Sequence, residues 1–122
     1  MSDSNPRENF SYFANELSNL ELGYLHMIER VGAYMQVAPD ARFASVIREI
    51  FKGTFILNGG YDAEKGNEAI RKGEADLISY GTLFLANPDL PDRFRRNAPL
   101  NAPDIKTFYV GEERGYIDYP TL

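Results

Sequence analysis

Three short runs of apolar residues stand out along the chain, and each is long enough for one β-strand. They cover residues 24–29, 54–57 and 77–80, and most of the side chains within each run are apolar. Strict alternation of apolar and polar residues would indicate a sheet with one wet face, whereas near-continuous apolar runs are typical of parallel strands covered on both faces. The pattern therefore predicts three parallel strands in an α/β fold.

Helical spacing of apolar residues separates these runs. The first helical stripe comprises Phe10, Phe13, Leu17 and Leu20, and the second comprises Phe43, Val46, Ile47, Ile50 and Phe51. Asn5-Pro6 with Glu8 has the residue types of a helix start with a capping box, and Gly23 is expected to break this helix. The helix starts expected further along are Asp40, Asp62 and Asn87-Pro88-Asp89, with stops at Gly53 and Gly73 and an inward pair at Leu90 and Phe94.

The predicted order is helix, strand, helix, strand, helix, strand, helix and tail, in a single domain over residues 1–122. Loops are expected at residues 31–39 and 98–103, and the aromatic tail 106–122 is expected to pack against the rest of the protein. The spacing of the strands suits right-handed strand–helix–strand crossovers.

Small residues follow two of the predicted strands and mark the candidate chemistry. Asn58-Gly59-Gly60 follows one strand, and Gly81-Thr82 follows the next. In a parallel sheet both turns lie at the carboxyl ends of the strands, where glycine lets backbone N–H groups approach an anion such as phosphate. The alternative is that these glycines only supply the positive φ that a tight strand-to-helix turn needs.

Composition narrows the class of protein. The formal net charge is −5, which argues against nucleic acid or an anionic membrane as the main partner. The chain has no cysteine and one histidine, so it offers no disulfide and no histidine-rich metal site, and no metal or catalytic residue is predicted. The polar N-terminus and the lack of a long apolar run lead to the expectation of a cytoplasmic protein.

The remaining polar candidates have structural explanations. His26, in an apolar strand, is expected to be a core or lining residue. We expect Asp62 to be an N-cap, Asp76 to mark a strand entry, and Glu29 to lie at the functional rim, where a ligand role stays open. Arg93, Arg95 and Arg96 are expected to form a solvated helix end.

Several runs together resemble a known family. They are NGGYD, ISYGTLFLANPDLPDRF, APLNAPDIKTFY and GYIDYP, preceded by DSNP and LGYLHMIE. In this order they resemble the C-terminal portion of the Old Yellow Enzyme family, flavin-dependent NAD(P)H oxidoreductases that reduce activated alkenes. The resemblance implies a partial (β/α)₈ TIM barrel, roughly its last three strand–helix units plus the C-terminal tail.

The resemblance also implies roles for individual residues. The backbones of Gly59, Gly60, Gly81 and Thr82 would hold the FMN phosphate, Phe108 would border the flavin, and Tyr109 would border the substrate pocket. Where this chain has Thr82, the family usually has arginine. Losing a charge-assisted contact costs about 1.5–3 kcal/mol, so we expect weaker FMN binding.

The family's substrate-anchoring pair, flavin-ring contacts and proton donor fall in the part that this chain does not match, so we expect no catalysis by the chain alone. Three strands would also leave one apolar sheet face and two strand edges uncovered. A complementary chain, self-association, or a cover made by the aromatic tail would each protect that face, and a truncated remnant is a further alternative. An unrelated doubly wound domain would instead carry helices on both faces.

Overall fold

The computed structural model describes residues 4–29, 43–110 and 112–122, which fall into two compact units. The first unit spans residues 1–79 and the second spans residues 80–122. The predicted loop at residues 31–39 and the predicted cap at Asp40 lie outside the described residues.

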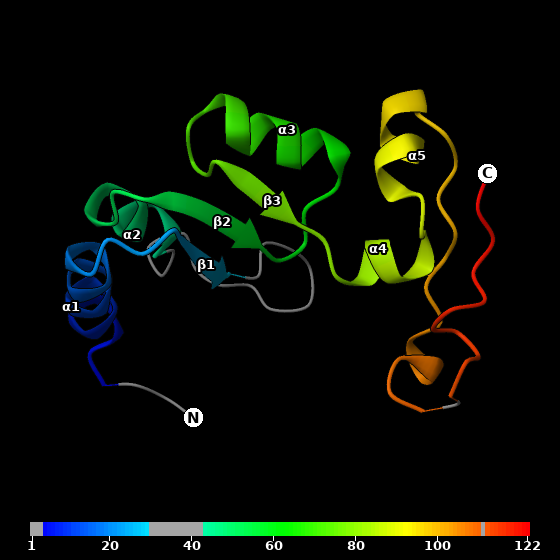
Figure 1. The fold of residues 1–122 in the computed structure, drawn as a ribbon, viewed down its shortest axis with the longest axis horizontal. Helices are drawn as coiled ribbons and strands as arrows, with labels where there is room; N and C mark the ends of the chain where they lie inside the picture. The colour runs from blue at the N-terminus through cyan, green and yellow to red at the C-terminus, as the bar shows by residue number, and fades with distance from the viewer. Residues whose placement is uncertain (1–3, 30–42, 111) are drawn as a thin grey trace. The chain divides into compact units, whose positions relative to one another are not determined.

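The described residues of the first unit form three strands and three helices in alternation. In order they are α1 (Pro6–Asn19), β1 (Tyr24–Ile28), α2 (Ala44–Ile50), β2 (Thr54–Asn58), α3 (Ala63–Arg71) and β3 (Leu77–Ser79). The strands form one parallel sheet in the order β1-β2-β3, with α3 beside β3 (Figure 1). The predicted three-stranded parallel sheet is therefore confirmed.

Local chemistry explains where the helices begin and end. The Asp62 carboxylate accepts a hydrogen bond from the Lys65 N–H at 2.8 Å, so the predicted cap of α3 is confirmed, and Gly73 follows that helix with φ +75°. Helix α1 begins at Pro6 with Asn5 as its N-cap, as predicted, but the Asn5 side chain does not accept a capping hydrogen bond, and its amide donates to the Glu8 carboxylate. Helix α1 also ends at Asn19, earlier than predicted from Gly23.

One face of the sheet carries the core. Phe55 and Leu57 of β2 are at most 1% exposed and pack with Ala14 of α1 and Ile47 of α2. Leu25 and Met27 of β1 and Ile78 of β3 lie against the same cluster. The register pairs Leu25 with Phe55 and Met27 with Leu57, so the inward side chains share one face.

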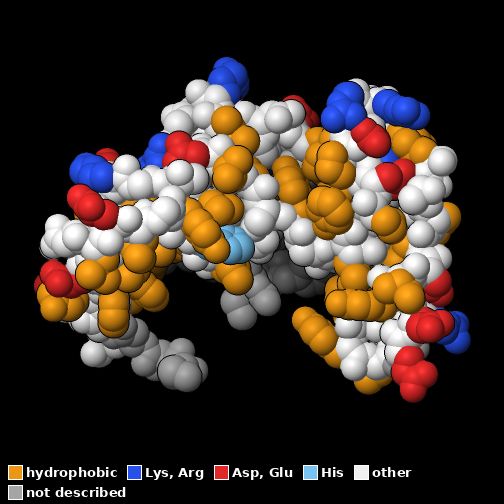
Figure 2. Space-filling view, viewed as in Figure 1, with side chains coloured by type: hydrophobic (Ala, Val, Ile, Leu, Met, Phe, Trp, Pro, Cys, Tyr) orange, Lys and Arg blue, Asp and Glu red, His pale blue; other side chains and the backbone are white. Residues whose placement is uncertain are grey.

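The opposite face of the sheet, here called the open face, comprises Tyr24, His26, Ile28, Thr54, Ile56, Asn58, Leu77 and Ser79. The exposed fractions of Tyr24, Ile28 and Leu77 are 62%, 68% and 52%. Helices α1 and α2 contribute to the core on the other face, and the exposure of Tyr24, Ile28 and Leu77 shows that no described helix covers these side chains. The doubly wound alternative therefore does not fit. Apolar side chains lie around the chain's one histidine on this surface (Figure 2).

In the second unit, the residues that the structure describes form two short helices and one 3₁₀ turn. They are α4 (Thr82–Ala86), α5 (Leu90–Arg96) and the turn Ile105–Thr107. A helix follows Asn87-Pro88-Asp89 as predicted, but its N-cap is Asp89 and it begins at Leu90 rather than at Pro88. The short helix α4, which ends at Ala86, was not predicted. The side chain of Asn87 is buried, donating to Leu83 O at 2.9 Å and accepting from Asn101 N–H at 2.7 Å. Leu90 and Phe94 lie inward as expected, with Phe94 edge-on to Tyr80.

Arg93 corrects the prediction of a solvated arginine group. Its side chain is buried, and its guanidinium donates to the Asp89 carboxylate at 2.7 Å and to the carbonyls of Pro99 and Pro120 at 2.6 and 2.8 Å. The Leu122 N–H also donates to Asp89, at 2.7 Å. Arg93 therefore fastens the C-terminal tail to α5.

The aromatic tail packs only in part. The Tyr119 hydroxyl accepts a hydrogen bond from the Asp104 N–H at 2.8 Å, whereas Tyr116 is 58% exposed and Tyr109 is 95% exposed. The expectation of a packed tail therefore holds for Tyr119 but not for those two residues. Among the described residues, no helix has the length and apolarity that a membrane crossing would require.

Candidate functional site

The carboxyl ends of β2 and β3 lie side by side. Asn58 and Ser79, the last residues of these strands, are register partners. The Asn58 side-chain amide donates to the Ser79 carbonyl and to the Ser79 hydroxyl, both at 2.9 Å. The turn that follows β2 thus starts beside the end of β3, as the sequence predicted for parallel strands.

Glycine is required by conformation in the first turn. Gly59 has φ +123° and Gly60 has φ +76°, a region that side chains with a Cβ rarely adopt. The simpler interpretation, a turn that needs positive φ, is therefore met here, and it is compatible with an anion held by the same backbone N–H groups.

Gly81 differs from the first turn. Its φ is −91°, so the turn conformation alone does not call for glycine. A Cβ added at Gly81 would meet nothing within 4 Å, which leaves the backbone open to a close approach from outside. Thr82, the next residue, is exposed and is the first residue of α4.

Helix ends contribute less to an anion site than the sequence suggests. The start of α3 is already occupied by the Asp62 carboxylate, and the hydrogen bond from the Lys65 N–H lowers the pKa of that carboxyl below its ordinary value. Asp62 is therefore charged at neutral pH and would repel a phosphate from this helix end. A phosphate near Gly59 and Gly60 would therefore contact the N–H groups of the turn rather than those at the start of α3.

The two aromatic candidates lie in the second unit. Phe108 is half-buried and Tyr109 exposed, and their rings meet edge-on with centroids 6.4 Å apart. They line, with Thr107, Val110, Glu112 and Tyr116, a hollow of about 410 Å³. Their roles toward flavin and substrate stay predictions.

His26 is a residue whose setting the sequence did not reveal. Its imidazole lies on the open face rather than in a core, and its Nε2 is 2.8 Å from the Ser79 hydroxyl. The strand register places His26 one row away from Asn58 and Ser79. The sequence does not contain this register, so the contact could not be predicted from it.

The two acidic candidates that flank strands, Glu29 after β1 and Asp76 before β3, have structural partners. Glu29 accepts hydrogen bonds from the N–H groups of Phe43 and Ala44, at 2.6 and 3.2 Å, at the start of α2. Asp76 pairs with the Arg48 guanidinium at 2.6 and 2.7 Å and accepts from the Phe55 N–H at 2.7 Å. Asp76 thus marks the strand entry as predicted, and the Glu29 carboxylate contacts the start of a helix.

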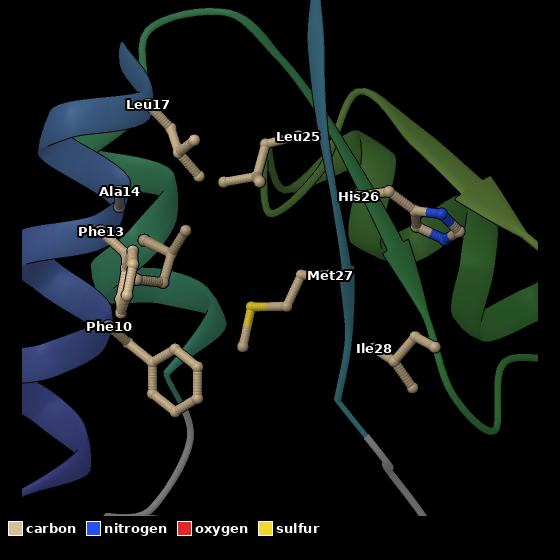
Figure 3. Close-up of a pocket in the computed structure, with 9 residues that line it drawn as sticks. Phe10, Phe13, Ala14, Leu17, Leu25, His26, Met27 and Ile28 are labelled. Carbon is tan, nitrogen blue, oxygen red and sulfur yellow. The ribbon is translucent and has the colours of Figure 1, made fainter. Parts of the chain in front are cut away.

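An apolar hollow of about 360 Å³ lies between α1 and the outer strand β1. Leu25 and Met27 point from β1 toward α1, while His26 and Ile28 point the other way (Figure 3). Phe10 and Phe13 of α1 line the hollow and are 47% and 60% exposed, and Leu20, at the C-cap of α1, is 68% exposed. The predicted buried stripe is therefore wrong for these three residues. The hollow adjoins the free edge of β1, which is the outer strand of the described sheet.

Comparison with known proteins gives a consistent result. The model of the NADH:flavin oxidoreductase / NADH oxidase family, an FMN family, matches residues 10–101. The 12-oxophytodienoate reductase 2 of Arabidopsis thaliana is 46% identical, over 98% of this chain and 33% of that protein. A 12-oxophytodienoate reductase-like protein of Solanum lycopersicum is 48% identical, over 98% of this chain and 32% of its own length.

Solved structures agree with the sequence comparison. Morphinone reductase superposes with a TM-score of 0.90 at 42% identity, over 99% of this chain and 32% of that one. The old yellow enzyme homologue of Zymomonas mobilis gives 0.91 at 38% identity, over 98% and 34%. The old yellow enzyme of Trypanosoma cruzi gives 0.88 at 35% identity, over 99% and 31%.

The chain spans about a third of the length of the relatives it matches. Those relatives are TIM barrels, and a parallel sheet with helices on one face is what a segment of such a barrel contains. The chain therefore belongs to the NADH:flavin oxidoreductase / NADH oxidase family, the Old Yellow Enzyme family, and it forms part of a (β/α)₈ barrel.

Proposed function

We propose that this chain is the phosphate-binding part of an FMN-dependent oxidoreductase and that it needs a complementary polypeptide for chemistry. The observation that carries the proposal is the Gly59-Gly60 turn with its two positive φ angles, at the carboxyl end of β2, in a chain whose residues 10–101 match an FMN family. Gly81 and Thr82, which follow β3, are the other proposed phosphate contacts, and Phe108 is the proposed neighbour of the flavin.

The residues of this chain are suited to binding a phosphate rather than to catalysing a reaction. The two turns offer backbone N–H groups, and the added space at Gly81 admits a ligand atom close to the chain. Bound FMN would supply hydride transfer between NAD(P)H and an activated alkene. This chain's own residues would bind and orient the phosphate end, and Tyr109 is the one proposed substrate-pocket residue.

A complementary polypeptide is proposed because the sheet is incomplete on its own. In a closed barrel the inner face is filled by side chains from all strands and no strand edge is free. Here Tyr24, Ile28 and Leu77 are exposed, and the apolar hollow adjoins the edge of β1. A chain carrying the other barrel strands would cover the open face and pair with that edge.

Titration with FMN and riboflavin tests the phosphate site. The two ligands share the same ring system, so their affinity ratio isolates the phosphate. We expect FMN to bind at least about tenfold more tightly, since one charge-assisted contact contributes about 1.5 kcal/mol or more. Equal quenching of the fluorescence of the two flavins at equal protein concentration would overturn the proposal.

An activity assay tests the need for a second polypeptide. The chain alone is expected to show no oxidation of NADPH with an activated enone, with or without added FMN. Mixing it with a polypeptide that carries the earlier barrel strands of a relative is expected to produce NADPH oxidation that depends on both chains. Turnover by this chain alone would contradict the proposal that catalysis needs a second polypeptide.

The exposed apolar face supports a second candidate. Without a complementary chain, copies of this protein would bury their open faces against one another, which gives a self-associating protein with no enzymatic activity. Sedimentation of the chain alone tests this alternative, because self-association predicts a species larger than the monomer at micromolar concentration.

A further inference from the structure

Three polar side chains, one from each strand, meet on the open face. Asn58 of β2 and Ser79 of β3 are register partners, and His26 of β1 lies one row nearer the amino ends of the strands. The His26 imidazole reaches diagonally across β2 to the Ser79 hydroxyl, at 2.8 Å. Adjacent strands are about 4.8 Å apart, so this contact joins the two outer strands over the central one.

The Ser79 hydroxyl can serve both of its partners at once. It has one donor and two acceptor sites. It accepts from the Asn58 side-chain amide at 2.9 Å, which leaves one donor and one acceptor site for the imidazole. Either neutral tautomer of His26 can therefore be satisfied, since Nε2 accepts in one and donates in the other.

The cluster is attached directly to the first glycine turn. Asn58 is the residue before Gly59, and its amide also donates to the Ser79 carbonyl at 2.9 Å. Its own carbonyl accepts from the Glu29 N–H at 3.0 Å, so the end of β2 is tied to both neighbouring strands. Because β3 is only three residues long, it forms few backbone hydrogen bonds with β2. Side-chain hydrogen bonds therefore contribute more to holding the end of β3 in place.

We propose that His26 and Ser79 are positioning residues for the Gly59-Gly60 turn and that His26 acts through Ser79 and Asn58. The inference rests on the proposed function, in which this turn holds a phosphate. Two successive glycines with positive φ form a backbone with many accessible conformations. A phosphate is bound well only if the turn is already held in one of these conformations. The cluster of His26, Asn58 and Ser79 holds Asn58, the residue from which the turn starts.

Four variants of the full chain test the inference. His26→Ala and Ser79→Ala remove the two links, Ser79→Thr keeps the hydroxyl, and the double variant His26→Ala/Ser79→Ala tests whether His26 works through Ser79. Leu77→Ala is the matched control, because Leu77 lies on the same face in the same row as His26 but has no polar group.

The first measurement needs no ligand. In the wild type, the amide order parameters of Gly59 and Gly60 from ¹⁵N relaxation are expected near those of rigid backbone, about 0.85. His26→Ala and Ser79→Ala are expected to lower them toward 0.6, whereas Ser79→Thr and Leu77→Ala keep the wild-type values. Unchanged values in both alanine variants, or an equal fall throughout β2, would overturn the positioning role.

The second measurement is the ratio of the FMN and riboflavin dissociation constants. His26→Ala and Ser79→Ala are expected to raise the FMN constant about three- to tenfold and to leave the riboflavin constant unchanged, which a general loss of stability would not do. Ser79→Thr should restore wild-type affinity, and the double variant should match Ser79→Ala alone. Additive effects would show that His26 does not act through Ser79.

The two measurements separate the inference from the proposed function. If the wild type binds FMN and riboflavin equally, the phosphate site fails while the order parameters still decide whether His26 and Ser79 hold the turn. If the wild type prefers FMN and the alanine variants keep that preference, the phosphate site stands and the positioning role fails.

Discussion

The sequence resemblance implies arginine at the position of Thr82. A guanidinium at this position would add a planar, charged donor beside Gly81, where the backbone is open. We expect Thr82→Arg to tighten FMN binding about ten- to hundredfold and to leave riboflavin binding unchanged. Thr82→Gln, which adds length without charge, is the control in the same fluorescence titration. Equal gains for both flavins would show that the added arginine contacts the ring system.

Asp76 gives stability a defined dependence on pH. Its hydrogen bonds from Arg48 and then from the Phe55 N–H lower the pKa of the carboxyl below its ordinary 3.8. The unfolded chain therefore takes up this proton at a higher pH than the folded chain does, so the stabilisation is present above about pH 4 and is lost as the pH falls below it.

We expect Asp76→Asn to lower the free energy of unfolding by about 1 kcal/mol at pH 7, a figure reduced because the pair is partly exposed. The difference from wild type should shrink in urea unfolding at pH 4 and vanish at still lower pH. Asp92→Asn, at an exposed pair with Arg95, is the control with little effect. A difference that persists undiminished in acid would contradict the assignment to the ionised carboxylate.

At the scale of elements, two similar sequence signals had different outcomes. At Asn5-Pro6 the helix begins at the proline as predicted, whereas after Asn87-Pro88 the helix begins only at Leu90 and an unpredicted helix, α4, ends just before Asn87. The side chain of Asn87 is committed to Leu83 and Asn101, a tertiary contact that local pattern does not contain. Helix α4 has only five residues, too few to show a period of 3.6.

The role of Arg93 also depends on tertiary contacts that the local sequence does not show. Three arginines at the end of a helix look alike in sequence, and only the fold distinguishes the buried one that holds the tail. We expect Arg93→Met to release residues 118–122, with their amide order parameters falling below about 0.6. Arg95→Met, at an exposed arginine of the same helix, should leave the tail ordered. A tail that stays rigid without Arg93 would contradict this role.

At the scale of the whole molecule, the strands, their parallel order and the Asp62 cap could be predicted because each depends on local patterns and short crossovers. The candidate turns were also located correctly by their glycines. The His26–Ser79 contact could not be predicted, because it requires the register of all three strands. The sequence also does not decide which sheet face stays open, the one with Tyr24 and Leu77 or the one with Leu25 and Ile78, because this depends on where the helices pack.

The open face predicts behaviour in solution. With Tyr24 and Leu77 exposed, the chain alone is expected to sediment as more than a monomer at micromolar concentration. Tyr24→Thr/Leu77→Thr should shift the protein toward the monomer without loss of its circular dichroism spectrum, since both positions are on strands and threonine suits strands. A compact wild-type monomer would show that the open face does not drive association.

The central claim is that the turns after β2 and β3 hold the phosphate of FMN, and amide chemical shifts test it most directly. In the ¹⁵N spectrum of the chain, FMN is expected to move the resonances of Gly59, Gly60, Gly81 and Thr82, and riboflavin is expected to leave them in place. Glycine resonances that do not move with FMN, or that move equally with riboflavin, would contradict the account.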